Sequence, residues 1–117
     1  MKEQALLYTE NLRKLLEEIQ EMYEDTRKTK AEHDFYTVIE PFVNGVRERA
    51  DQWQEAINRV VAANPAYFVG ERQIGQVVDN ICTLSIQAFQ HTASYSRFKS
   101  YYQSTMFLLK TIERQLR

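Results

Sequence analysis

Apolar side chains near the start of the chain recur at alternating steps of three and four residues. The segment runs from about Glu3 to Arg27, and its apolar positions are Ala5, Tyr8, Leu12, Leu15, Ile19 and Met22. This spacing places the side chains along one face of an α-helix, whereas a half-buried strand would need a spacing of two. The face is wide enough for a helix that contacts two neighbours. Its width comes from further apolar residues, which are Leu6, Leu7, Leu16 and Tyr23.

A second segment with helical spacing follows Asp34, whose side chain can accept a free backbone N–H at a helix start. The segment stops at Asn64, since the residue before a proline avoids the α conformation. Pro41 falls about two turns inside, so it must either kink the helix or mark a restart with Pro41 in the first turn. The expected core positions are Phe35, Ile39, Phe42, Val43, Val46, Ala50, Trp53, Ile57 and Val60.

Two more helices are predicted in the second half of the chain. After a connection at 66–70 that carries Tyr67 and Phe68, a helix runs from about Glu71 to His91. Its apolar face consists of Ile74, Val77, Ile81, Leu84 and Ala88. A polar break at 92–96 follows, with Ser94 or Ser96 as the expected cap of the last helix. The face of that helix consists of Phe98, Tyr101, Thr105, Leu108 and Ile112, flanked by Tyr102 and Leu109.

The number and length of the connections decide the architecture. Only three Gly and two Pro occur in 117 residues, too few for the many tight turns of a sandwich or barrel. Short connections make sequential helices antiparallel neighbours, so their apolar faces meet in one core. We therefore expect one domain spanning residues 1–117, an all-α, antiparallel up-and-down four-helix bundle. Its second helix should be kinked or restarted near Pro41.

Charge and cysteine content limit which cellular compartment and which classes of partner are expected. Fifteen basic and sixteen acidic side chains give a formal charge of −1, which provides no field for a phosphate backbone. No run approaches the 18 apolar residues of a spanning helix, so neither nucleic acid nor membrane is an expected partner. Cys82 is a single cysteine and has no internal disulfide partner, and residues 1–4 lack the apolar core of a signal peptide. These features predict a cytoplasmic protein.

A series of residues between about 33 and 110 resembles the YppE-like family, small proteins of Gram-positive bacteria. The matching residues are His33-Asp34-Phe35-Tyr36, Ile39-Glu40-Pro41, Trp53, Pro65, Tyr67, Gln73-Ile74, Asp79-Asn80, Gln87, His91 and Arg97-Phe98-Lys99. The first predicted helix matches only in its pattern. The resemblance implies a four-helix bundle and supplies no activity or catalytic residue.

The residue types of metal and nucleophilic sites are sparse. A di-iron bundle needs Glu-x-x-His on two helices, and the sequence has no such pair. Its two histidines, His33 and His91, cannot form a three-histidine site, and His91 is expected to be structural. Cys82 falls in the middle of a helix among apolar residues, where nothing lowers the pKa of a thiol. We expect no cofactor and assign no catalytic residue.

Acidic residues supply the alternative functional hypothesis. Glu17, Glu18 and Glu21 on the first helix, with Glu48 and Asp51 on the second, resemble the carboxylates of all-α nucleotide pyrophosphohydrolases, which hold Mg²⁺. Counting from Ala5 and Tyr8 as core positions, these side chains fall mainly on outward positions. The pattern is therefore more typical of a solvated helix face than of an enzyme.

Surplus apolar residues support the preferred hypothesis. Ile86 and Phe107 do not fit the main faces of their helices, and Tyr102 could add contact area beside them. Exposed apolar groups that cluster mark an interface. We therefore predict a non-catalytic interaction or structural protein that binds a partner protein or forms a homodimer through Ile86, Phe107 and Tyr102. A weaker hypothesis is a small-ligand site near Pro41 and Trp53, where a kinked helix could leave space.

Overall fold

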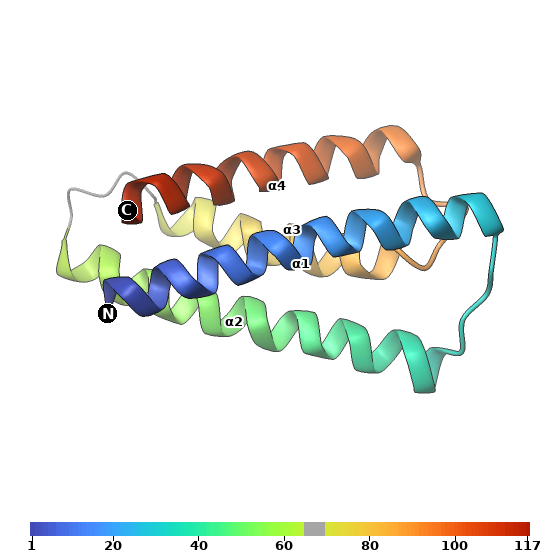
Figure 1. The fold of residues 1–117 in the computed structure, drawn as a ribbon, viewed down its shortest axis with the longest axis horizontal. Coiled ribbons are helices and arrows are strands. Elements are labelled where there is room, and N and C mark those ends of the chain that lie inside the picture. The colour runs from blue at the N-terminus through green and yellow to red at the C-terminus, as the bar shows by residue number, and fades with distance from the viewer. Residues whose placement is uncertain (65–69) are drawn as a thin grey trace.

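The computed structural model describes residues 1–64 and 70–117, and within them the chain forms four long α-helices and one short π-helical turn. The elements are α1 (Lys2–Thr29), η1 (Phe35–Ile39), α2 (Glu40–Ala63), α3 (Glu71–Gln87) and α4 (Tyr95–Leu116). Each helix packs against the next along the chain, and α1 also packs against α4 (Figure 1). The predicted antiparallel four-helix bundle is confirmed. None of the described helices combines the length and apolarity needed to cross a bilayer.

The predicted helix starts are confirmed by their hydrogen bonds. Asp34 Oδ2 accepts the backbone N–H of Thr37 at 2.8 Å and the Thr37 hydroxyl at 2.9 Å, which fixes the start of η1. Pro41 then lies in the first turn of α2, so the second helix restarts there as expected. At α4, Ser94 is the cap and its hydroxyl accepts the N–H of Arg97 at 3.4 Å.

Two connections show how helices end without glycine. Lys30 caps α1 in the left-handed conformation, with φ 54°, and its N–H donates to the Thr26 carbonyl at 2.7 Å. Helix α3 ends at Gln87, four residues before the predicted His91. The chain leaves the helix there because the amides of Phe89 and Gln90 bond carbonyls three residues back. Residues 65–69 lie outside the described part, and with them Tyr67 and Phe68 of the expected connection.

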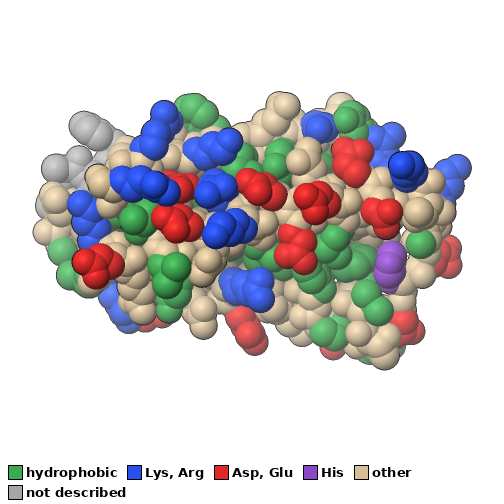
Figure 2. Space-filling model, in the orientation of Figure 1, with side chains coloured by type: hydrophobic (Ala, Val, Ile, Leu, Met, Phe, Trp, Pro, Cys, Tyr) green, Lys and Arg blue, Asp and Glu red, His purple; other side chains and the backbone are tan. Residues whose placement is uncertain are grey.

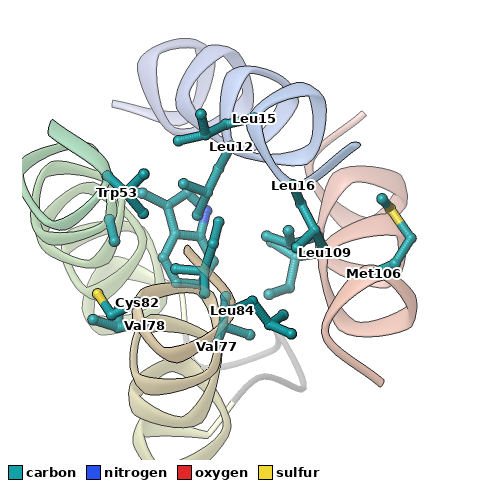
Figure 3. Packing of buried hydrophobic residues seen from close by; sticks show 14 of the residues in the cluster. Leu12, Leu15, Leu16, Trp53, Val77, Val78, Cys82, Leu84, Met106 and Leu109 are labelled. Carbon is teal, nitrogen blue, oxygen red and sulfur yellow. The ribbon is translucent and has the colours of Figure 1, made fainter. Parts of the chain in front are cut away.

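The core lies where the four apolar faces meet, and the indole of Trp53 sits near its centre (Figure 3). Trp53, Ile57 and Phe98 are fully or almost fully buried, as predicted. Three predictions are wrong, and one concerns Leu7 of α1, which leaves 53% of its surface exposed. Phe35 leaves 53% of its surface exposed, because η1 turns it away from the bundle, and Tyr101 leaves 44% exposed. Helix α4 is rotated so that the buried line runs through Phe98, Thr105, Leu109, Ile112 and Leu116.

Candidate functional site

The five carboxylates of the magnesium hypothesis do not converge. Glu17, Glu18 and Glu21 are exposed on α1, and Glu48 and Asp51 are exposed on α2. Glu17 also forms an ion pair with Arg13 at 3.1 Å. Within residues 1–64 and 70–117, no three His, Cys, Asp or Glu side chains gather closely enough to hold a metal ion. The structure thus gives this alternative no support.

The remaining reactive side chains occupy structural positions. Cys82 is 4% exposed, and burial raises the pKa of its thiol, which disfavours the nucleophilic thiolate. It lies on the side of α3 that faces α2 (Figure 3). His33 is exposed and meets the ring of Phe89 edge-on, with ring centroids 5.4 Å apart. His91 lies half-buried in the turn after α3 and is therefore not part of a helix.

The structure gives no support to the small-ligand site expected near Pro41 and Trp53. The Trp53 ring is fully buried, and its Nε1–H donates to Thr9 Oγ1 at 2.9 Å. A hollow of about 430 Å³ does lie between α1 and α2, beside Arg49 and Gln52. Arg49 is about two helical turns and Gln52 about three helical turns from Pro41. Its other lining residues are Tyr8, Asn11, Leu12, Lys14, Leu15 and Glu18.

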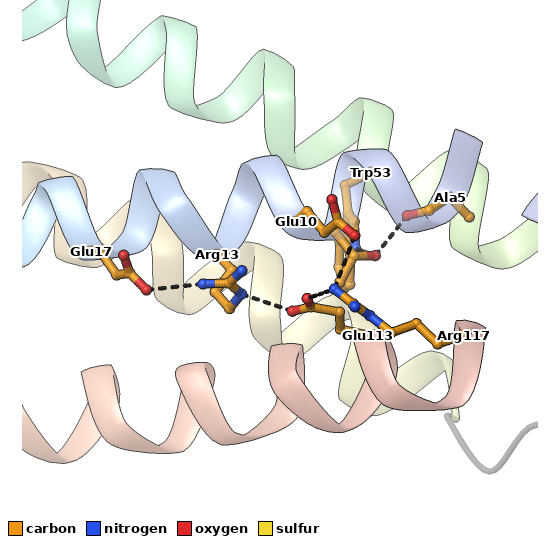
Figure 4. A network of polar contacts seen from close by, with 8 residues as sticks. Ala5, Glu10, Arg13, Glu17, Trp53, Glu113 and Arg117 are labelled. Carbon is orange, nitrogen blue, oxygen red and sulfur yellow. Dashed lines mark hydrogen bonds and ion pairs between the residues drawn. The ribbon is translucent and has the colours of Figure 1, made fainter. Parts of the chain in front are cut away.

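A buried carboxylate organises the contact between α1 and α4 (Figure 4). Glu113 of α4 accepts from Arg13 Nε at 2.7 Å and from Arg117 Nη2 at 2.6 Å, and its side chain is only 10% exposed. Burial alone raises the pKa of Glu113, but the two guanidinium groups outweigh it and hold this pKa below its usual value. Arg13 also contacts Glu17, and Arg117 contacts Glu10 at 3.2 Å. The network fixes two arginines at the surface of the bundle.

Those arginines border a second hollow, of about 620 Å³, which we call the basic hollow. It is lined by Arg13, Phe107, Lys110, Glu113, Arg114 and Arg117. Figure 2 shows Lys and Arg side chains gathered on this face, over α1 and α4 near the end that holds both termini. Phe107 is 66% exposed among these charges. The hollow therefore combines an apolar contact surface with four cationic side chains.

A group of aromatic and aliphatic side chains lies at the other end of the bundle, around η1. We call Phe35, Tyr36 and Val38 the aromatic end; all three are exposed, and Tyr36 is 76% exposed. The rings of Phe35 and Tyr36 meet edge-on with centroids 5.2 Å apart. In the first turn of α2, partly buried Phe42 packs on Phe89, with ring centroids 5.7 Å apart. Along the sequence, these three residues are the closest group of exposed large apolar side chains in the described chain, since they fall within four positions.

The structure separates the three residues predicted to form an interface. Ile86 is 44% exposed and lies one turn beyond Cys82, on the flank of α3 towards α2. Phe107 lies on the outer side of α4, next to Arg13 of α1. Tyr102 is half-buried, and Glu17 and Glu21 of α1 are its charged neighbours. These side chains do not form one cluster, and their role in an interface stays a prediction.

Both surfaces contain residues that sequence reasoning missed. Phe35 and Tyr36 fall where the apolar spacing that leads into α2 begins, and the spacing alone assigned Phe35 to the core. Arg114 and Arg117 lie in the last turns of the final helix, where basic side chains commonly complement the helix dipole, so the helical pattern assigns them no further role. The signal for the basic hollow is the run of cations at steps of three and four from Lys110 to Arg117, with Phe107 one turn earlier.

The fold and these surfaces define a small all-α bundle that exposes a basic hollow near one end and apolar side chains at the other. The chain belongs to the family described as a bacterial domain of unknown function (DUF1798), whose model matches residues 9–116. The resemblance to YppE-like proteins is thereby confirmed.

Relatives of known sequence or structure share this architecture. The uncharacterized protein YppE of Bacillus subtilis (strain 168) is 26% identical over 117 residues, covering 99% of this chain and 95% of the relative. A protein of unknown function from Listeria innocua superposes with a TM-score of 0.93 at 30% identity, covering 98% of this chain and 92% of its own. A Staphylococcus aureus protein of the DUF1798 family shares the fold, with a TM-score of 0.82 at 19% identity and coverages of 98% and 97%.

Proposed function

We propose that the protein is a non-catalytic binding module of the bacterial cytoplasm that recognises a partner protein through the aromatic end. The carrying observation is the exposure of Phe35 and Tyr36 on a turn that the rest of the structure holds in place. Large aromatic side chains contribute much contact area for few rotatable bonds, so they are suited to recognition. The free thiol of Cys82 supports a reducing compartment.

The turn that presents the two rings is held from both sides. Asp34 binds the backbone N–H and the hydroxyl of Thr37, and these bonds hold the pKa of Asp34 below its usual value. At its other end the turn continues directly into α2 at Glu40, and Phe42 in the first turn of that helix packs on Phe89. Because the turn is already ordered, binding would cost little conformational entropy. An exposed apolar surface that is ordered without a partner is typical of a recognition site.

Site-specific photo-crosslinking in the source bacterium tests the proposal. A benzophenone amino acid replaces Tyr36, and the matched control carries it at Asn58, an exposed position about 27 Å from the start of α2 at Glu40. We expect one discrete crosslinked protein from position 36 and none from position 58. A species of twice 13.9 kDa would identify a second copy of this chain as the partner.

Specificity is checked with Phe35→Ser in the crosslinking protein, followed by reconstitution from purified components. The Ser variant should fold, because Phe35 is half exposed, but it should lose the adduct. Circular dichroism verifies the fold. Equal crosslinking at positions 36 and 58, or an adduct that survives Phe35→Ser, would overturn the proposal.

A further inference from the structure

The cations that line the basic hollow are not all neutralised. Arg13 and Arg117 share Glu113 and also contact Glu17 and Glu10. Lys110 and Arg114 form no ion pair with any carboxylate of the described chain; Arg114 reaches only the Thr111 hydroxyl, at 3.5 Å. The hollow thus carries two cations without a carboxylate partner, although the net charge of the whole protein is close to zero. Its local field attracts an anionic group.

Glu113 prepares the hollow for such a group. Its two oxygens hold one nitrogen each of Arg13 and Arg117, so both guanidinium planes are fixed while other N–H donors remain available. Without this carboxylate, Arg13 would keep only its contact with Glu17 and Arg117 only its contact with Glu10, so neither guanidinium group would be held towards the other. The buried acid therefore orients donors, although its own charge opposes an incoming anion.

Phe107 decides the class of the anionic group. Its ring is two-thirds exposed inside the hollow, where a phosphate or a free metabolite would leave it in water. A ligand that carries acidic and apolar groups in alternation satisfies both the cations and the ring.

The geometry points to the basic hollow as the docking site for an acidic peptide segment of a partner protein. Carboxylates of the peptide pair with Lys110 and Arg114, and one of its apolar side chains packs on Phe107. This site is separate from the aromatic end, so either can fail without the other. Steering by the exposed cations makes the association weaken as salt is added.

Two synthetic peptides test the site by NMR on the isotope-labelled protein. One is a short capped peptide in which Glu alternates with Leu and Phe, and the other has Gln in place of each Glu. We expect the acidic peptide, at millimolar concentration, to shift the amide signals of Phe107, Lys110 and Arg114. The Gln peptide should bind about tenfold more weakly or not at all.

Charge reversal gives the matched comparison. Lys110→Glu with Arg114→Glu should weaken binding by about tenfold or more. Arg47→Glu with Arg72→Glu changes two exposed cations of α2 and α3 and should leave binding unchanged. Phe107→Ala should weaken binding but keep its salt dependence, and the amide spectra verify that each variant is folded.

Three results would overturn the assignment. They are an absence of shifts in the hollow with the acidic peptide, equal binding of both peptides, and equal effects of the two double variants. Vesicles of anionic phosphatidylglycerol serve as the competing probe. If they bind the protein through Lys110 and Arg114 while the acidic peptide does not, the hollow is a membrane-contact site instead.

Discussion

The indole N–H of Trp53 donates to the hydroxyl of Thr9 across the α1–α2 contact, at 2.9 Å between Nε1 and Oγ1, and both residues are fully buried. The same hydroxyl donates to the Ala5 carbonyl at 2.7 Å (Figure 4). One threonine therefore satisfies the polar atom of the largest side chain in the core. A buried donor that loses its acceptor has a high free-energy cost.

Thr9→Val keeps the shape of the side chain but removes the acceptor, so it should lower the free energy of unfolding by about 1–3 kcal/mol. Urea unfolding followed by far-ultraviolet circular dichroism measures the change. In a Trp53→Phe background the same substitution should cost less, since no indole N–H is left unpaired. An equal cost in both backgrounds would show that the hydrogen bond contributes nothing.

Glu113→Gln should destabilise the bundle by about 1–3 kcal/mol, because a nearly buried charge that binds two arginines is removed. Glu48→Gln is the matched control, because Glu48 is exposed and should stay within about 0.5 kcal/mol of the parent protein. Urea unfolding near neutral pH compares the two variants. Similar small effects would mean that the network is a surface feature with little energetic weight.

The Glu113 contribution should also depend on pH. Arg13 and Arg117 hold the pKa of Glu113 below its unfolded value, so the unfolded state binds more protons than the folded state as the solution is acidified. The extra stability is present above the unfolded pKa, near about 4.3, and is lost as the pH falls through the folded pKa. The stability difference between parent and Glu113→Gln should therefore shrink at low pH, and a constant difference would contradict this.

Lys30→Gly should be more stable than Lys30→Ala by about 1 kcal/mol. Both variants lose the charge, but only glycine adopts the left-handed conformation of this cap, φ 54°, without steric cost. Thermal unfolding of the two variants measures the difference. If alanine is as stable as glycine, the end of α1 rearranges when the side chain changes.

Cys82 should react with a thiol reagent at least about a hundredfold more slowly in the native protein than in denaturant. The side chain is 4% exposed, and burial raises the pKa of the thiol, so both access and thiolate population are low. The absorbance of released thionitrobenzoate follows the reaction. Immediate reaction of the native protein would show that α2 and α3 separate readily around this residue.

The sequence predicted those parts of the fold that depend on local chemistry. Asp34, Pro41 and Ser94 act where their side chains dictate, at helix starts. The end of α3 was missed because no glycine or proline marks it. Its position depends instead on distant contacts, namely the packing of Phe89 on Phe42 and the hydrogen bond from the Tyr23 hydroxyl to the Ala93 carbonyl, 2.8 Å long.

Side-chain direction was harder to predict than helix position. In α4, lines through Tyr101 and through Tyr102 both have helical spacing, and only the position of α1 and α3 selects the second. The basic hollow and the aromatic end also depend on how the helices pack against one another. Glu113 acquires its role because Arg13, 100 positions earlier, lies beside it, and no local pattern encodes that distance.

That separation along the chain has a kinetic consequence. Joining α1 to α4 requires closure of nearly the whole polypeptide, whereas the other extensive helix contacts join helices that follow each other in the sequence. Contacts with the highest loop-closure cost are expected to form after the transition state, so Glu113→Gln should speed unfolding and leave the refolding rate nearly unchanged in stopped-flow experiments. A refolding rate that falls in proportion to stability would place this contact in the folding nucleus instead. The contact between α1 and α4, which closes last during folding, is then also the contact that opens first in the native protein.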